Sequence, residues 1–328
     1  MRFFTFAALT ALFLGAGCSG FQSSSPPVSE QPAGIAPSDV VRDASKQLLY
    51  VGFLASSGNG AVVFDQHGSN QHPIGQISQG VDAPFGVFVD DKHNLYVANV
   101  KSGTVTVYPP GASSPSETLE GAGAPIDVTV AHDGTVYVVN DQAVYSRTGG
   151  GSVLEYDSGQ TKPSKTIVTF VKKSWPRAVA LDSGGDLFVA YNRDGGASWK
   201  PDGRVLEFAP GSSSGKDLGI RVGEAGGLAI DKHDNLVLVQ YGNSYYFPPN
   251  INIFAPGSKK PTKQVPSPYG YPGYAVALNQ SNTEMWLSCP SLGVAFGVTY
   301  PGGKLVDTIS SGLSGFTLGI ATDPNGAP

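Results

Sequence analysis

Short apolar runs separated by polar turns recur along most of this chain. In residues 84–108 an apolar run leads into the polar turn Asp90 to Asn94, a second apolar run follows, and a third run, Thr104 to Tyr108, alternates polar and apolar residues. Runs rich in β-branched residues that are bounded by turn residues predict antiparallel hairpins. The basic unit of this chain is therefore expected to be a strand–turn–strand–turn–strand segment.

The Asp or Asn after the first strand recurs at Asp90, Asp133, Asp182, Asp231 and Asn279, at intervals of roughly 43 to 49 residues, which is the range of four-stranded propeller blades. After the third strand of each copy comes a Ser/Pro/Lys-rich turn and a short fourth strand, such as Ser116 to Leu119 or Thr166 to Phe170. The copies begin at Gln47, Pro84, Pro125, Pro176, Gly226 and Gly273. We predict an all-β fold, a six-bladed β-propeller of four-stranded antiparallel blades, over residues 47–328.

The C-terminal segment matches only the opening of a copy, with Gly319 placed like Gly86 and Asp323 like Asp90. A closed ring removes the open edge of its first sheet when the last part of the chain joins that sheet. We expect Leu318 to Thr322 to form the innermost strand of the blade completed by Leu48 to Ser78. Val40 to Asp43 is the alternative for this position.

The repeated residues resemble those of a known family. Pro-x-Gly-Val-x-Val-Asp, Leu-Tyr-Val-Ala-Asn and Val-x-Val-Tyr, as they stand between Pro84 and Tyr108, are similar to NHL-repeat propellers, which are related to the gluconolactonase-like six-bladed group. The resemblance covers residues 47–323 and implies six blades around a central channel. It does not select a function, since such propellers include hydrolases, lyases and binding modules.

Composition narrows the range of partners. The chain has 43 Gly and 25 Pro in 328 residues, 14% charged residues and a formal net charge of -5. The sequence contains no basic stripe, so nucleic acid is not an expected partner. We expect a monomer.

The N-terminus predicts export. Arg2 precedes an apolar run, Phe3 to Leu14, which is too short to span a membrane. The residues that follow, ending in Ala16-Gly17-Cys18, resemble a bacterial lipobox, although Gly15 stands where a branched aliphatic residue is usual. We expect residues 1–17 to be a signal peptide and residues 18–46 to be a lipidated Cys18 with a flexible Ser/Pro-rich tether. An ordinary secretory signal is the alternative.

This prediction places the protein in the bacterial cell envelope, attached to a membrane through its lipid anchor only. The other cysteine is Cys289. With Cys18 lipidated, no intrachain disulfide can form, and Cys289 is expected to be a small buried residue.

Topology assigns the loops to two faces. Connections between second and third strands share one face with the connections between blades, which we call the variable face; the opposite, turn face carries the other hairpin turns. Aromatic residues gather in the variable-face segments, and loops on rigid scaffolds are common binding sites. The candidate ligand-binding residues are Trp175, Arg177, Tyr191, Asn192, Trp199, Tyr241, Tyr245, Tyr246, Tyr271 and Tyr274. The alternative is that these aromatics pack on one another.

Polar residues form a second candidate site. Asn99, Asn140, Asn192 and Gln240 end second strands, and we expect them at the mouth of the channel on the variable face. The gluconolactonase-like resemblance implies a Glu/Asn/Asp set that holds a divalent cation such as calcium. Asp127, Asn140, Asn192 and Glu224 are the candidate ligands, but the family's metal-binding Glu at the start of the first blade has no counterpart. We favour strand-end caps for the Asn residues.

The repeated carboxylates Asp90, Asp133, Asp182 and Asp231 are expected to stabilise their own turns, because Asp at such positions accepts backbone hydrogen bonds. No residue is assigned a catalytic role. Two hypotheses follow. The first is an exported, lipid-anchored module that binds a glycan, peptide or protein through the variable face without a cofactor. The alternative is a metal-assisted lactonase or ester hydrolase, with calcium as its cofactor.

Overall fold

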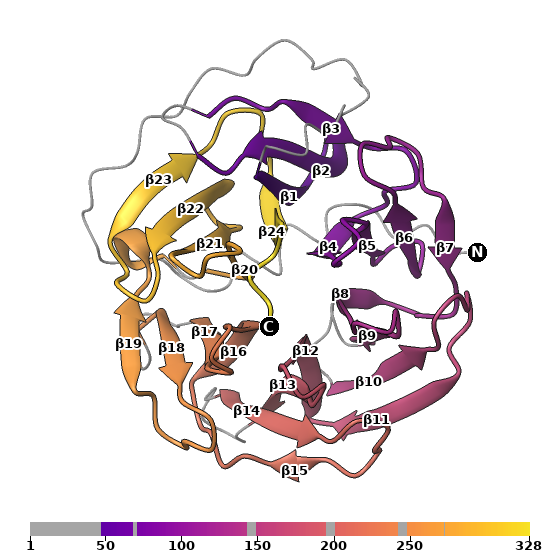
Figure 1. Cartoon of the computed structure of the whole chain (residues 1–328), viewed down its shortest axis with the longest axis vertical. Coiled ribbons are helices and arrows are strands. Elements are labelled where there is room, and N and C mark those ends of the chain that lie inside the picture. Colours follow the sequence, from indigo (N-terminus) through magenta and orange to yellow (C-terminus); the bar gives the residue numbers. More distant parts are fainter. Residues whose placement is uncertain (1–46, 68–70, 143–148, 195–200, 242–247, 272) are drawn as a thin grey trace.

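The computed structural model describes residues 47–67, 71–142, 149–194, 201–241, 248–271 and 273–328. Six four-stranded antiparallel sheets stand around a central channel as the blades of a propeller (Figure 1). Each blade runs outward from an innermost strand. The innermost strands are β24 (Phe316–Asp323), β4 (Pro84–Val89), β8 (Pro125–Val130), β12 (Ser174–Leu181), β16 (Glu224–Ile230) and β20 (Val276–Leu278), of blades one to six in that order.

The other strands follow in the same blade order. The second strands are β1 (Leu48–Ala55), β5 (Leu95–Asn99), β9 (Val136–Asn140), β13 (Leu187–Asp194), β17 (Leu236–Tyr241) and β21 (Glu284–Cys289). The third strands are β2 (Gly58–Asp65), β6 (Thr104–Tyr108), β10 (Gly149–Tyr156), β14 (Pro201–Phe208), β18 (Asn250–Phe254) and β22 (Val294–Thr299). The outer strands are β3 (Gly75–Ile77), β7 (Glu117–Leu119), β11 (Lys165–Lys172), β15 (Lys216–Asp217), β19 (Lys263–Pro266) and β23 (Leu305–Ile309).

The closing strand is confirmed. β24 pairs with β1 along Leu48↔Asp323 to Leu54↔Phe316, so the end of the chain completes the first blade from the inside. The alternative segment, residues 40–43, lies outside the described residues. Because β1 is paired on both sides, its inner edge is not left open, and the first blade has four strands like the others.

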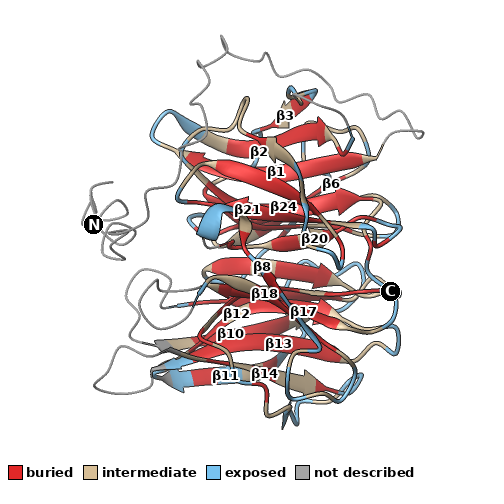
Figure 2. Ribbon diagram, turned by 90° about the vertical axis from the view of Figure 1, so that its left-hand side faces the viewer, coloured by how far each residue is buried: buried red, intermediate tan, exposed pale blue. Residues whose placement is uncertain are grey.

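Neighbouring blades bury their apolar faces against each other. One cluster joins Tyr96 and Val105 of blade two to Val128, Val138 and Leu154 of blade three. Figure 2 shows the buried strands stacked through the body of the ring, with exposed residues mainly at the turns. Fully burying such a side chain contributes about 1.5–3 kcal/mol, so packing between blades is the main stabilising interaction.

The turns after the innermost strands share one conformation. The first residue accepts hydrogen bonds from its own turn: Asp90 Oδ1 from the backbone of Lys92 and Asn94, at 2.9 and 2.8 Å. Asp182 and Asp231 make the same contact from the first position, and Asp133 accepts from Thr135 N from the third position of its turn, which begins at Ala131. The structural role expected for these carboxylates is confirmed.

The fourth residue of each turn has a left-handed backbone, with φ of 64° at His93, 59° at Asp234 and 53° at Asn282. Its side chain reaches the turn of the preceding blade. Asp234 Oδ1 accepts a 2.9 Å bond from Ser183 N, and Asn282 Oδ1 accepts a 2.7 Å bond from Lys232 N. His93 bonds to Asp323 of the closing strand in the same way. The turn face is thus linked from blade to blade.

Glycine interrupts this linkage. Blades three and four have Gly134 and Gly185 at the fourth position, with φ of 89° and 80°, and these have no side chain to reach across. Between blades two and three His132 bonds to Asp91 instead. Between blades three and four the cross-blade contact comes from a carboxylate inside the channel, Asp127, which is described below.

Candidate functional site

The channel is closed near the variable face by one residue from each blade, at or just before its innermost strand. These residues stand at equivalent places in the register, and we call them the gate ring: Phe85, Ile126, Arg177, Gly226, Tyr274 and Leu318. The register with the second strand shifts at this position in blades two to five, between Pro84 and Gly86 for example. A β-bulge leaves its extra residue unpaired and changes the direction of that residue's side chain. The gate residues therefore stand outside the regular pairing of the innermost and second strands.

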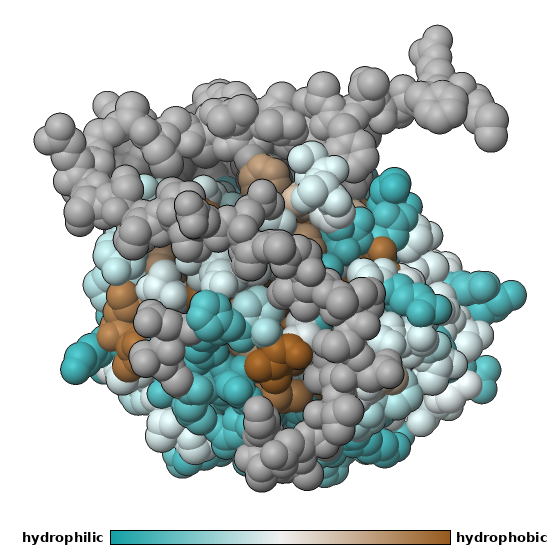
Figure 3. Space-filling model, turned by 90° about the horizontal axis from the view of Figure 1, so that it is seen from above, coloured by the Kyte–Doolittle hydropathy of each residue, from teal (hydrophilic) through white to brown (hydrophobic). Residues whose placement is uncertain are grey.

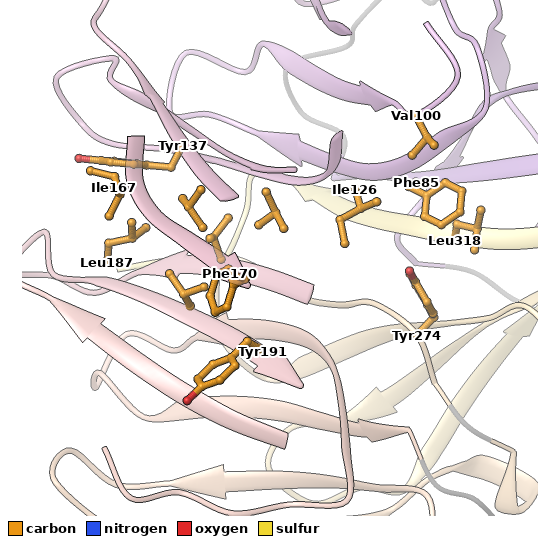
Figure 4. Packing of buried hydrophobic residues seen from close by; sticks show 14 of the residues in the cluster. Phe85, Val100, Ile126, Tyr137, Ile167, Phe170, Leu187, Tyr191, Tyr274 and Leu318 are labelled. Carbon is orange, nitrogen blue, oxygen red and sulfur yellow. The ribbon is translucent and has the colours of Figure 1, made fainter. Parts of the chain in front are cut away.

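Gate side chains meet across the ring axis. The Phe85 and Tyr274 rings, from blades two and six, are edge to face at 6.3 Å although blade one stands between them. The Arg177 guanidinium of blade four lies over the Tyr274 ring, 4.9 Å from its centroid. Figure 4 shows Phe85, Ile126, Leu318 and Tyr274 converging, and all four are buried. The gate ring therefore closes this end of the channel.

Arg177 is the only cation in the gate ring. Its Nη1 lies 4.0 Å from Asp141 Oδ2, and its Nε has no hydrogen-bond partner within the described part of the chain. Burial lowers the pKa of the guanidinium, but Tyr274, Asp141 and Glu224 raise it further, so the net pKa shift is upward. Arg177 thus carries a permanent charge that nearby carboxylates largely balance.

Asp127 occupies a position that five blades fill with glycine or alanine. We call this level the contact ring: Gly86, Asp127, Ala178, Gly227, Ala275 and Gly319. Backbones approach closely here; a Cβ on Gly86 would lie 2.7 Å from Asp127 Cα. Asp127 Oδ2 accepts a 3.0 Å hydrogen bond from Val179 N in the next blade. Burial raises the pKa of this carboxyl to about 7, although the bond from Val179 opposes the shift.

A cavity of about 290 Å³ fills the channel beyond the gate ring. Its lining comes from all six innermost strands and is mainly aliphatic. At the variable-face end the lining stops at gate residues such as Phe85, Arg177 and Tyr274, whereas at the other end it includes the exposed Asp91, His132 and Ser183. The cavity therefore opens on the turn face. From the sequence we expected the channel mouth on the variable face, but the gate side chains close that end.

The strand-end amides bind backbone instead of facing the channel. Asn99 Oδ1 accepts from Asp82 N, Asn140 Oδ1 from Ala124 N, and Gln240 Oε1 from Gly223 N, all at 2.9–3.0 Å. Asn192 exchanges two bonds with Ala225 of the next blade. None of the four amides lines the cavity. Their contacts hold the connections that lead into the innermost strands.

The candidate metal ligands are not brought together as one cluster of free oxygens. Asn140 and Asn192 are engaged as above, Asp127 binds Val179 N, and Glu224 begins β16 outside the cavity lining. Among the described residues no group of three His, Cys, Asp or Glu side chains is placed to hold a metal ion. Cys289 is fully buried, and its exposed fraction is zero.

The structure divides the aromatic candidates into three groups. Trp175, Tyr191 and Tyr274 are at most 9% exposed and belong to the interior. Tyr241 and Tyr271 are half-buried. Trp199, Tyr245 and Tyr246 lie outside the described residues. Burial, with Glu224 and Cys289 nearby, raises the pKa of Tyr241 to about 12, so this phenol stays neutral.

Tyr269, which was not among the candidates, is the most exposed aromatic in the described part of the chain, at 48%. It lies in the short 3-10 helix η1 (Pro268–Gly270), between blades five and six on the variable face. Its φ is 53°, and its ring lies 5.7 Å from that of Phe296. The neighbouring prolines and glycine were the signal in the sequence that a tight, outward-pointing turn forms here.

The rest of the surface offers few large apolar side chains. Ile74, Val171 and Val306 are the others exposed among the described residues. Seen from the side in Figure 3, hydrophobic patches are small and separated by hydrophilic residues. In the described ranges no helix is long and apolar enough to cross a membrane.

Comparison with known proteins identifies the fold alone. No family model matches the chain, and no curated protein matches it. Many solved structures do. A chain in the crystal structure of the nidogen/laminin complex is similar with a TM-score of 0.64 and 13% identity, covering 85% of this chain and 98% of the other.

Two further structures are a protein of unknown function from Bacteroides caccae (TM-score 0.56, 12% identity, 85% and 99% covered) and the PQQ-bound aldose sugar dehydrogenase from Streptomyces coelicolor (0.51, 15%, 75% and 86%). One comes from a complex between proteins and another is an enzyme. At such low identity these similarities establish a six-bladed β-propeller and leave its activity open.

Proposed function

We propose that this protein is an exported, lipid-anchored propeller of the NHL type that binds a glycan, peptide or protein through its variable face, without catalysis. Arg2, the apolar run Phe3 to Leu14 and Cys18 support export and anchoring. The Ser/Pro-rich residues 19–46 provide a tether between the membrane and the ring.

The observation that carries the binding proposal is the presentation of Tyr269. A non-glycine residue with a left-handed backbone costs about 1–3 kcal/mol, and such strain persists where the surroundings impose it, often at ligand contacts. Here the strained tyrosine is half exposed and its ring is supported by Phe296. Tyrosine combines a flat apolar ring with a hydroxyl, which suits contact with sugar rings and peptides.

The alternative, a metal-assisted hydrolase, has less support. The cavity walls are mainly Val, Ala, Ile, Leu and Gly, and Asp127 is the one candidate metal ligand among the described lining residues. A single carboxylate that already binds a backbone N–H is a poor calcium site, since calcium takes six to eight oxygen ligands. A calcium-dependent rise in melting temperature would revive this alternative.

Binding can be tested on glycan and peptide arrays with the Cys18→Ser chain. Tyr269→Ala and Tyr271→Ala are expected to lower the signal of any hit at least tenfold. Val306→Ala is the matched control, because Val306 is equally exposed, at 46%, on the outer strand β23. If the array yields no hit, or if Tyr269→Ala binds every hit like the parent chain, this site is wrong.

The anchor has its own test. In bacterial cells expressing the full chain, Cys18 should incorporate labelled fatty acid, and the protein should remain with the membrane fraction. The Cys18→Ser variant should do neither, while Cys289→Ser should behave like the parent. Equal labelling of the Cys18→Ser variant would show that the cleavage site has been misassigned.

A further inference from the structure

Five of the six innermost strands carry a threonine or an alanine at one level of the cavity wall. This level lies one residue after Val87 in blade two and after the matching residue in each other blade. Its six residues, which we call the small-residue ring, are Phe88, Thr129, Ala180, Ala229, Ala277 and Ala321. All six line the cavity. Phe88 also packs against the cluster between blades two and three, whereas the shorter side chains of the other five blades extend less far from the wall. Concave apolar sites with a few placed polar groups are typical of small-molecule binding.

The polar group at the deep end is the carboxyl of Asp127. The other five contact-ring residues are glycine or alanine, so close packing alone favours a small residue at this place. Asp127 uses one oxygen on Val179 N, and no cationic side chain of the described residues lies within ion-pair distance of it. The Arg177 charge lowers the pKa of Asp127 from a greater distance, so the carboxyl has a nearby positive charge but no ion-pair partner among the described residues.

Charges along the cavity favour a cation. Asp91 and Asp182 line the mouth on the turn face, and His132 there is bonded to Asp91. At the deep end the positive charge of Arg177 is balanced by Asp141 and Glu224, which lie on the far side of the gate. The remaining uncompensated side-chain charge in the lining is negative.

We propose that the channel binds a small organic amine, with its apolar body among the aliphatic walls and its ammonium group at Asp127. The ligand enters from the turn face, opposite the surface assigned to the protein or glycan partner. The site is therefore independent of the proposed function, and neither depends on the other. The ammonium forms a charge-assisted hydrogen bond to Asp127 Oδ1, the oxygen that does not bind Val179 N, and the phenyl or alkyl part fills the space beside Ala229 and Ala277.

The binding should be coupled to a proton. Because burial raises the pKa of Asp127 to about 7, part of the protein carries a protonated Asp127 at neutral pH, and binding of an ammonium ion releases that proton. Two other ionisable side chains face Asp127: Arg177 from β12 and Tyr274 from the segment before β20. The pKa of each is raised, so neither side chain changes charge between pH 5 and 8. His132 at the mouth is the other group that can titrate in this range.

The test is calorimetric titration of the Cys18→Ser chain with three probes of similar shape: phenethylamine, 2-phenylethanol and 3-phenylpropionate. The amine is expected to bind at least tenfold more tightly than the alcohol, and the carboxylate least of all. Amine affinity should fall below pH 7, and heats measured in buffers of different ionisation enthalpy should reveal proton release.

Three variants locate the site. Asp127→Asn keeps an oxygen for Val179 N but loses the charge, and should weaken the amine at least tenfold while leaving the alcohol unchanged; its binding should also lose the pH dependence. Ala277→Phe places in blade six the residue found at the same level in blade two and should block all three probes. Glu117→Gln on β7 removes an equal charge far from the channel and should bind like the parent.

The proposal is overturned if phenethylamine does not bind, if the alcohol or the carboxylate binds equally well, or if Asp127→Asn retains amine affinity. It is also overturned if the pH dependence persists in Asp127→Asn, because His132 would then be its origin. Should Asp127→Asn fail to fold, Ala277→Phe decides the location alone, and unchanged amine binding by that variant rejects the channel.

Discussion

The imidazole of His93 is hydrogen-bonded to the carboxylate of Asp323, and this contact ties the turn of blade two to the last residue of the closing strand. Asp323 is 1% exposed, whereas His93 is partly exposed. The exposed pair His132 and Asp91 joins blades two and three on the same face. The molecule thus has two cross-blade His–Asp contacts that differ in burial.

The burial difference predicts different effects of histidine removal. His93→Ala removes one hydrogen bond from the buried carboxylate of Asp323, which costs about 1–3 kcal/mol. His132→Ala breaks an exposed pair and should cost about 0–1 kcal/mol. Denaturant unfolding followed by circular dichroism measures both. Equal losses for the two variants would mean that the His93 contact does not secure the closing strand.

Removing the closing strand should have the largest effect. A chain that ends at Gly315 lacks the buried Leu318, Ile320 and Ala321 and leaves the edge of β1 unpaired. We expect it to lose cooperative thermal unfolding or to aggregate. The control chain lacks only the exposed Ala327 and Pro328 and should melt close to the parent. A normal melting curve for the longer truncation would show that another segment closes the ring.

Asp127 predicts how stability depends on pH. Its pKa in the folded protein is about 7, against an ordinary value of 3.8. Between these values the unfolded chain has released the proton and the folded protein has kept it, so stability falls as pH rises through this window and then levels off. The slope is about 1.4 kcal/mol for each pH unit at most.

Asp127→Asn should therefore lose less stability than the parent between pH 4.5 and 7.5, in denaturant titrations at matched ionic strength. Glu117→Gln is again the control and should follow the parent. Parallel curves for the parent and Asp127→Asn would mean that this carboxyl ionises in the folded protein as it does in water.

A charge at an innermost strand tests the packing between blades. Val87 on β4 is 6% exposed and belongs to the cluster shared by blades one and two. Val87→Asp loses about 1.5–3 kcal/mol of burial and adds a desolvated carboxylate, so the domain should unfold. Val306→Asp, at a site 46% exposed, should be tolerated, as judged by soluble yield and melting temperature. A stable Val87→Asp protein would contradict the strand assignment.

Much of the fold could be predicted from the sequence because each blade repeats the same local signals. Asp90, Asp182 and Asp231 mark one turn, and the partial copy around Gly319 marks the closing strand. The residues that form the hydrogen bonds between blades on the turn face could also have been recognised in the sequence. His93, Asp234 and Asn282 stand at the fourth turn position, where Gly134 and Gly185 show that a left-handed backbone is needed.

The channel mouth could not be predicted from the sequence. Its location depends on β-bulges that place Phe85, Ile126 and Arg177 across the axis, and a one-residue bulge leaves no clear mark in a single sequence. Nor does composition distinguish an aromatic that binds a ligand from one that packs. Trp175, Tyr191 and Tyr274 lie beside loops in the sequence, yet their side chains are buried in the interior.

The pairing of β24 with β1 also governs the order in which the protein can mature. The first sheet is begun by residues near position 48 and finished by residues near position 323. Until the final strand has been synthesised, β1 has an unpaired edge. Such an edge can pair with a strand of another chain. The first blade can therefore be completed only after residue 323 has been synthesised, whereas the other five blades are each built from one continuous stretch of chain.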